Sequence, residues 1–160
     1  MSLATTVAVV SLSSVAFAQE LQTYDTVGVW DVLVDTTIGN GCLINAEFED
    51  GSDVRIGFAP DTGFGYILAM NAAWEGIVPG TVYPISMDVD GAEYEGEGTG
   101  IIIDDTPGVD IEFDSADFLL DVATKQTLTL SNDAGPVMSI DLTDSLLALE
   151  SAIECQEAQG

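Results

Sequence analysis

Alternating apolar and polar positions dominate the chain from residue 28 onward, and this period of two predicts strands joined by tight turns. The clearest run is residues 42–49, in which every second side chain is apolar: Cys42, Ile44, Ala46 and Phe48. Because successive side chains of a strand point to opposite faces, this run places Cys42 in the core.

Residues 82–103 form the best-defined hairpin of the predicted sheet. Asp90 and Gly91 supply a two-residue type I′ turn between two runs of strand-forming residues. That turn sets the register, in which residue 89 pairs with 92, 88 with 93, 87 with 94 and 85 with 96. The apolar pairs agree with one another in this register.

Two helices interrupt the strand pattern. Ser115 is a candidate N-cap for a short helix near 115–125, with an acid in the first turn and Lys125 at the far end. A second helix is predicted near 143–155, with Thr143 or Asp144 as its cap. It carries an apolar stripe at helical spacing: Leu142, Leu146, Leu149 and Ile153.

The C-terminal helix has a second face, which bears on the cysteines. At about 100° per residue, Cys155 lies beside Ala148 and Ala152, away from the leucine stripe. Such small side chains let a helix backbone approach a strand closely, as a disulfide requires. We therefore expect the leucine stripe to be buried and the alanine face to meet Cys42.

Together these elements predict a mainly β fold, a β-rich α+β domain. Roughly seven to nine antiparallel strands would form a sandwich or a flattened barrel. The predicted domain spans residues 19–160, and a chain of 160 residues is long enough to bury a core of its own. No internal repeat, low-complexity tract or linker divides it.

Residues 1–18 have the pattern of a cleaved secretory signal peptide. They contain no charged side chain, are apolar in the middle and end in Ala16-Phe17-Ala18. No basic residue precedes the apolar run, which departs from the usual signal pattern. The run is too short and too rich in Ser and Thr to span a membrane. We therefore expect cleavage after Ala18 and a periplasmic or secreted protein, with no membrane span left after cleavage.

Export changes the interpretation of the two cysteines, because cysteines of exported proteins usually pair. A bond between Cys42 and Cys155 would close a loop of over a hundred residues. The chain-entropy model assigns about 4–5 kcal/mol to such a bond. The C-x-x-C spacing of redox enzymes is absent, so we predict a structural Cys42–Cys155 disulfide.

Acidic residues dominate the electrostatics of the chain. It has 28 Asp and Glu residues against Arg55 and Lys125, and its formal net charge is −26. A field of this sign repels nucleic acid and anionic membrane surfaces, so neither is an expected partner. Adaptation to a saline environment, which favours acidic surfaces whatever each protein does, is the favoured cause of the acidity.

Histidine is absent from the chain. Its absence removes the commonest general base, the Ser-His and Cys-His pairs and the usual ligands of catalytic zinc. No phosphate-binding loop, dinucleotide fingerprint or nucleophile elbow is present. Two carboxylates in a cleft can hydrolyse a glycoside, but with 28 acids any such pair is unspecific. The protein is therefore predicted not to be an enzyme, and a carboxylate-only hydrolase ranks third among its functions.

The acidic hairpin is the candidate metal site. Asp88 faces Glu93 across the predicted strand pair, a like-charge contact, and Asp90 and Glu95 add two more carboxylates. A Ca²⁺ ion would relieve this repulsion because it prefers oxygen ligands. Exposed acids that are screened by salt would tolerate one another without a metal. No other cofactor is predicted.

Aromatic side chains are the other candidate binding surface, although in a domain of this size they more often belong to the core and its edge. The aromatic residues concerned are Trp30, Tyr66, Trp74, Tyr83 and Tyr94.

Four features occur together in this chain: an export signal, an early strand at Gly41-Cys42, a β-rich middle with Asn71-Ala72-Ala73-Trp74, and a terminal helix with Leu142-x-x-Ser145, Ala148 and Cys155. In this combination the chain is similar in outline to the invasion-associated-locus-B-like group of small exported proteobacterial proteins of uncertain function. The resemblance covers most of the mature chain and includes no catalytic motif. It implies an exported β-rich domain, whereas the group's usual basic residues are nearly missing here.

The leading function is a non-catalytic, periplasmic or secreted binding domain for an unknown envelope or extracellular protein or ligand. Hairpin 82–103 or the loop around Trp74 is its expected contact surface. The alternative is a Ca²⁺- or small-ligand-binding domain that uses the acidic hairpin 88–97.

Overall fold

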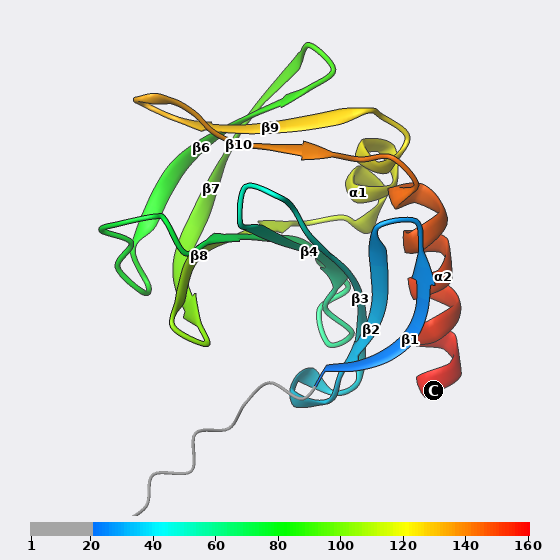
Figure 1. Cartoon of the computed structure of the whole chain (residues 1–160). Helices are drawn as coiled ribbons and strands as arrows, with labels where there is room; N and C mark the ends of the chain where they lie inside the picture. The colour runs from blue at the N-terminus through cyan, green and yellow to red at the C-terminus, as the bar shows by residue number, and fades with distance from the viewer. Residues whose placement is uncertain (1–20) are drawn as a thin grey trace, which may run out of the picture.

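Ten antiparallel strands of one sheet and two α-helices make up residues 21–160, the part of the chain that this computed structural model describes (Figure 1). The strands are β1 (Leu21–Val27), β2 (Trp30–Asp35), β3 (Gly41–Glu47), β4 (Ser52–Phe58), β5 (Gly65–Asn71), β6 (Val82–Val89), β7 (Ala92–Ile103), β8 (Thr106–Phe113), β9 (Thr127–Asn132) and β10 (Gly135–Asp141). The helices are α1 (Ala116–Ala123) and α2 (Ser145–Gln159), and a 3-10 turn covers Thr36–Ile38. The expected signal peptide, residues 1–18, lies outside the described residues.

The sheet is open, with the strand order β1-β2-β3-β4-β5-β8-β7-β6-β9-β10. It curls strongly, so that β9 and β10 cross above β8 and β4 (Figure 1). The mainly β, antiparallel prediction and both predicted helices are confirmed. The strand number is higher than expected because β1 was missed: its residues are mostly exposed and lack an apolar alternation.

One hydrophobic core fills the space inside the curl. It includes Trp30 from β2, Ile56 from β4, Ile111 from β8 and Leu130 from β9, all essentially inaccessible to water. The indole Nε1 of Trp30 donates a hydrogen bond to the carbonyl oxygen of Thr143 at 3.0 Å. The N–H of the buried indole thus has a hydrogen-bond partner, and this bond connects β2 to the segment before α2.

The hairpin of β6 and β7 has the predicted register: 89 pairs with 92, 88 with 93, 87 with 94 and 85 with 96. Asp90 and Gly91 have φ angles of 51° and 89°. Both values are positive, as a type I′ turn requires. The Asp90 carboxylate also connects this turn to β9. It accepts hydrogen bonds from the backbone N–H groups of Gln126 (3.0 Å) and Thr127 (3.1 Å) at the start of that strand.

The Cys42–Cys155 disulfide is present, with an S–S length of 2.03 Å and a Cα–Cα separation of 6.1 Å. It joins β3 to α2, which packs across β1, β2 and β3 (Figure 1). Beside it, the side-chain oxygen of Gln156 accepts a hydrogen bond from the backbone N–H of Cys42 at 2.9 Å.

The buried face of α2 differs in part from the predicted one. Leu149 is buried, but Leu146 and Ile153 are only half-buried. The predicted alanine face does meet Cys42, and the small residues that are fully buried are Ser145, Ala148, Ala152 and Cys155. Small side chains let the helix lie close to the sheet, and the disulfide holds that face inward, so the larger stripe is rotated toward the helix flank.

The helix starts were predicted with mixed success. Ser115 caps α1 by accepting a hydrogen bond from the N–H of Asp117 at 3.1 Å, as expected. Asp144 occupies the N-cap position of α2, but its backbone is left-handed (φ 64°) and its side chain makes no capping hydrogen bond. The expected side-chain cap is therefore wrong for Asp144. The preceding turn is held instead by Asp141, whose carboxylate accepts from the N–H and the hydroxyl of Thr143.

Candidate functional site

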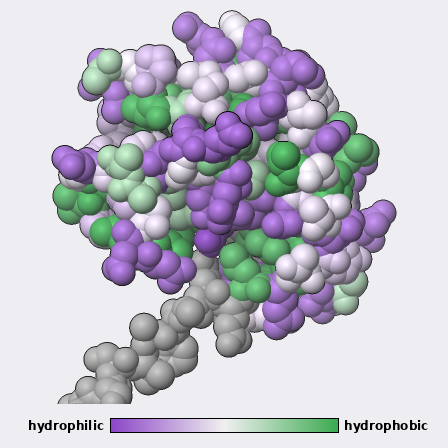
Figure 2. All heavy atoms as spheres, in the orientation of Figure 1, coloured by the Kyte–Doolittle hydropathy of each residue, from purple (hydrophilic) through white to green (hydrophobic). Residues whose placement is uncertain are grey.

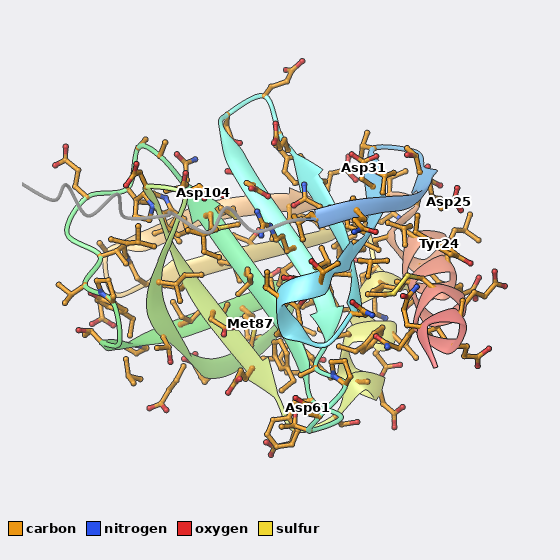
Figure 3. All side chains as sticks on the ribbon, turned by 90° about the horizontal axis from the view of Figure 1, so that it is seen from below. Tyr24, Asp25, Asp31, Asp61, Met87 and Asp104 are labelled. Atoms are coloured by element: carbon orange, nitrogen blue, oxygen red, sulfur yellow. A yellow bond between two sulfur atoms is a disulfide. The ribbon has the colours of Figure 1, made fainter. Side chains whose placement is uncertain are left out.

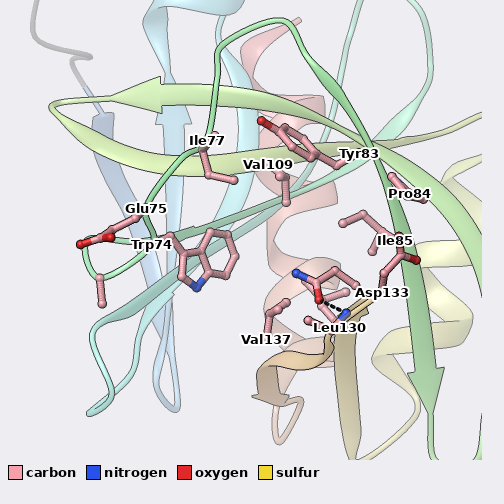
Figure 4. A pocket seen from close by; sticks show the side chains of 13 residues that line it. Trp74, Glu75, Ile77, Tyr83, Pro84, Ile85, Val109, Leu130, Asp133 and Val137 are labelled. Atoms are coloured by element: carbon pink, nitrogen blue, oxygen red, sulfur yellow. Dashed lines mark hydrogen bonds between the residues drawn. The ribbon is translucent and has the colours of Figure 1, made fainter.

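A cavity of about 510 Å³ is the candidate binding site (Figure 4). Its walls come from the β5–β6 connection, from β6 and β8, and from the β9–β10 hairpin. The side chains that shape it are Trp74, Ile77, Tyr83, Ile85, Val109, Leu130 and Val137. We call this the Trp74 cavity.

The floor of the Trp74 cavity is part of the core. Ile85, Val109 and Leu130 have exposed fractions of 5%, 4% and 0%. They lie on β6, β8 and β9; β9 pairs directly with β6, and β7 separates β6 from β8. All three side chains are aliphatic, so the floor offers a ligand dispersion contacts and no hydrogen bond.

The outer wall is the loop that carries Trp74, and hydrogen bonds fix its two ends. At the start, Asn71 accepts hydrogen bonds from the N–H of Trp74 through its carbonyl (3.0 Å) and from the N–H of Ala73 through its side chain (2.9 Å). Toward the end, the hydroxyl of Tyr83 accepts from the N–H of Val78 at 2.9 Å. The half-buried indole is thus carried on a defined turn beside the opening.

The mouth of the cavity is polar and acidic. Glu75, Asn132 and Asp133 lie among its lining residues and are all exposed. Asn132 uses its side-chain oxygen to accept a hydrogen bond from the N–H of Ala134 at 2.9 Å, which shapes the β9–β10 turn (Figure 4). None of the residues that line the cavity is basic.

A second, smaller hollow of about 310 Å³ lies between β7, β8 and the start of α1. Phe118 is its central ring: it stacks on Phe113 at a centroid distance of 4.7 Å and meets Tyr94 edge-on at 5.3 Å. In these contacts the three rings cover one another's apolar surface. This hollow therefore offers a ligand less free apolar surface than the Trp74 cavity does.

The outer face of the sheet carries a polar cluster of Asn45, Asp53, Arg55, Tyr66 and Asp110, which lie on β3, β4, β5 and β8. The buried Arg55 guanidinium donates from Nε to Asn45 Oδ1 at 3.2 Å and lies 3.7 Å from Asp53 Oδ2. Two carboxylate oxygens, Asp53 Oδ1 and Asp110 Oδ1, are buried with no hydrogen-bond partner among residues 21–160.

Burial dominates the protonation equilibria of this outer-face cluster. It raises the pKa of Asp53, although the charge of Arg55 opposes the effect. It also raises the pKa of Asp110 to about 6, with the charge of Glu112 as a second cause. Burial again is the main cause of the raised pKa of the Tyr66 phenol. None of its residues lines the Trp74 cavity or the smaller hollow, and we treat the cluster as a polar part of the framework.

Three of the four candidate calcium ligands already bind protein groups. Asp88 accepts from the N–H of Gly91 at 3.0 Å, Asp90 holds β9 as described above, and Glu95 accepts from the hydroxyl of Ser86 at 3.0 Å. Asp88 does face Glu93 across the strand pair. Within residues 21–160, no three His, Cys, Asp or Glu side chains come together in a way that could hold a metal ion. Calcium binding by Asp88, Asp90, Glu93 and Glu95 stays a prediction.

The acidic residues are spread around the molecule. Seen from below, Asp25 and Asp31 lie close together on β1 and β2, whereas Asp61 and Asp104 lie in other parts of the molecule (Figure 3). The face shown in Figure 2 is largely hydrophilic, with separate hydrophobic areas between the polar ones. Both views fit a general electrostatic role for the acids, such as solubility.

The five aromatic candidates separate into different environments. Trp30 is a core residue, Tyr66 belongs to the outer-face cluster and Tyr94 packs on Phe118. Trp74 and Tyr83 line the same cavity. The two contact surfaces that the sequence suggested separately, the Trp74 loop and hairpin 82–103, therefore meet at one site. Leu130 and Val137 were not expected there, because nothing in their local sequence indicates that β9 lies next to β6.

No helix in residues 21–160 is both long and apolar enough to cross a membrane.

Comparison with known proteins gives a match at the level of the fold. No protein-family model matches the chain, and no curated protein matches it. Among solved structures, the crystal structure of invasion associated protein B from Bartonella henselae superposes with a TM-score of 0.61. The two sequences are 16% identical, and the match covers 83% of this chain and 97% of the other. At this identity the likeness shows the fold alone, and it confirms the resemblance in outline that the sequence indicated.

Proposed function

We propose that this protein is a non-catalytic, exported binding domain that holds a small apolar molecule in the Trp74 cavity. The cavity itself carries the proposal. Its volume of about 510 Å³ falls within the range of about 300–1,000 Å³ that small-molecule sites occupy.

The shape of the cavity favours a small molecule over a flat protein surface. Its floor is made by core residues, Ile85, Val109 and Leu130, which a flat partner would leave uncovered. Burying an apolar ligand there removes its surface from water, which contributes about 25 cal/mol per Å².

A non-catalytic role agrees with the chemistry of the lining. No histidine exists in the chain, and the hydroxyl of Tyr83 is occupied by the N–H of Val78. The floor has no ionisable group, so a bound molecule would meet apolar contacts and no positioned acid, base or nucleophile.

A periplasmic or secreted location is part of the proposal. The Cys42–Cys155 disulfide supports it, because such bonds persist in oxidising compartments and are rare in the cytosol. The apolar residues 1–18 support it as a signal sequence.

Fluorescence titration with 1-N-phenylnaphthylamine, a neutral apolar dye, tests the proposal. We expect saturable enhancement with the wild-type protein and a loss of affinity of at least about tenfold in Val137→Phe, which narrows the mouth. Val82→Phe is the matched control, since Val82 is an exposed β-strand residue outside the cavity. Absence of saturable binding, or equal affinities for the two variants, would contradict a ligand site in the Trp74 cavity.

A further inference from the structure

The charged and amide side chains of the Trp74 cavity are all exposed, and none belongs to its floor. The floor is aliphatic, whereas Glu75, Asn132 and Asp133 are exposed at the mouth. A polar group of a bound molecule would have no hydrogen-bond partner on the floor and would lose its hydration there, which costs free energy. A ligand with both an apolar and a polar part must therefore place its polar part at the mouth.

The mouth has one sign of charge. Two of its three exposed polar side chains, Glu75 and Asp133, are carboxylates, and no basic residue lines the cavity. The chain's two basic side chains lie elsewhere: Arg55 in the outer-face cluster and Lys125 beyond the end of α1. An anionic head group at the mouth would meet like charges with no cation to neutralise it, whereas a cationic one would be attracted.

Two aromatic rings add to this preference. Trp74 and Tyr83 both line the cavity, and Figure 4 shows both rings on its walls. The face of an indole or a phenol ring attracts an alkylammonium group, and quaternary ammonium ligands are recognised in this way in many proteins. Aromatic rings on the walls, together with carboxylates among the exposed lining residues, are the combination that such a head group fits.

From these observations we infer that the Trp74 cavity selects amphiphiles with a cationic head, an alkyl- or arylammonium group attached to an apolar body, over anionic ones of the same body. This inference rests on the proposed function, because it names the class of ligand for the same cavity. The net charge of −26 favours cations everywhere on the surface, so the test must separate the local carboxylates from the general field.

Displacement of 1-N-phenylnaphthylamine by three competitors with one decyl chain provides the test: decyltrimethylammonium, decanol and decyl sulfate. The two surfactants are used below their micelle concentrations and decanol below its solubility limit, all at 150 mM ionic strength, where the Debye length is about 8 Å and distant charges are screened. We expect the cation to displace the dye at least about fivefold more effectively than decanol, and decyl sulfate to be the weakest competitor.

The decisive comparison is between two double variants of equal net charge. Glu75→Gln/Asp133→Asn should reduce the preference for the cation over the anion by about fourfold or more, since an exposed ion pair contributes roughly two- to fivefold. The control Glu154→Gln/Glu157→Gln removes two exposed carboxylates of α2 and should change the preference less than twofold.

The outcomes separate the two proposals. Equal displacement by all three competitors, or an equal effect of both double variants, would overturn the charge selection while leaving the apolar site in place. A dye that does not bind, or that binds with the same affinity to Val137→Phe, would overturn the site itself.

Discussion

Replacing Asp110 by asparagine should stabilise the protein at neutral pH, and the gain should disappear in acid. Asp110 lies on β8, between Leu68 of β5 and Thr99 of β7. Its Oδ1 is buried and accepts no hydrogen bond from residues 21–160. Asparagine has nearly the same shape and removes the charge, so Asp110→Asn relieves the cost of burying an ionised carboxylate.

The magnitude follows from the shift in the protonation equilibrium. The pKa of Asp110 rises from an ordinary 3.8 to about 6, first because of burial and second because of the charge of Glu112. At about 1.4 kcal/mol per pH unit, the difference corresponds to about 3 kcal/mol as an upper limit. The carboxyl keeps partial contact with solvent, and screening reduces the expected effect to about 1–2 kcal/mol.

The sign of the pH dependence follows from the direction of that change. A carboxyl whose folded-state pKa is raised favours the folded state fully at pH values below 3.8, and this contribution is lost as the pH rises through about 6. Asp110→Asn should therefore match the wild type near pH 3.5 and exceed its free energy of unfolding by about 1–2 kcal/mol above pH 7.

Urea unfolding at several pH values between 3.5 and 8 measures this difference directly. Asp114→Asn is the matched control, because Asp114 is an exposed carboxylate directly after β8 and its replacement should change little at any pH. A difference for Asp110→Asn that is independent of pH, or a loss of stability at pH 8, would refute the account of the buried carboxylate.

Three further predictions follow from the packing, the disulfide and the hairpin. Removing the Cys42–Cys155 bond in a double serine variant should lower the free energy of unfolding by up to about 5 kcal/mol, since the bond joins residues 113 positions apart; urea melts with an unchanged midpoint would contradict this. Gly108→Ala should destabilise the protein by about 2 kcal/mol or more, because its Cβ would clash with Met70 and lie 2.7 Å from a backbone oxygen. Gly96→Ala, whose nearest neighbour is the flexible end of a methionine at 3.4 Å, should be nearly neutral, and equal losses in the two variants would refute the packing argument. If the acidic hairpin binds calcium, millimolar Ca²⁺ should raise the thermal midpoint saturably, whereas a midpoint unchanged relative to matched ionic strength would contradict that site.

Local patterns in the sequence predict much of this fold correctly. The turn at Asp90 and Gly91 sets the β6–β7 register through backbone geometry alone, and the structure has that register. The alternation in residues 42–49 places Cys42 inside, where Cys155 reaches it. Each of these predictions depends on a physical constraint that acts within a few residues or on the pairing of two cysteines.

The features that were missed depend on contacts between distant segments. The alanine face of α2 meets Cys42 as predicted, but Leu146 and Ile153 are only half-buried, because the helix approaches β2 and β3 through its small residues. Strand β1 is mostly exposed, and its edge position follows from pairing with β2.

The Trp74 cavity is the clearest case of a feature that local sequence does not encode. It requires Leu130 of β9 to lie near Ile85 of β6 and Val109 of β8, an arrangement set by strand order and by the curl of the sheet. The sequence indicated Trp74 and hairpin 82–103 as contact surfaces, but it contains no local signal that joins them.

Mapping the binding site by methyl NMR tests the central claim most directly. With Ile, Leu and Val methyl groups labelled, titration with 1-N-phenylnaphthylamine should shift the signals of Ile77, Ile85, Val109, Leu130 and Val137. The signals of methyl groups on the outer face and on α2, such as those of Leu43 and Leu147, should keep their chemical shifts. Saturable shifts confined to the Trp74 cavity are the predicted result, and shifts that are scattered over the surface or centred on another site would contradict the account.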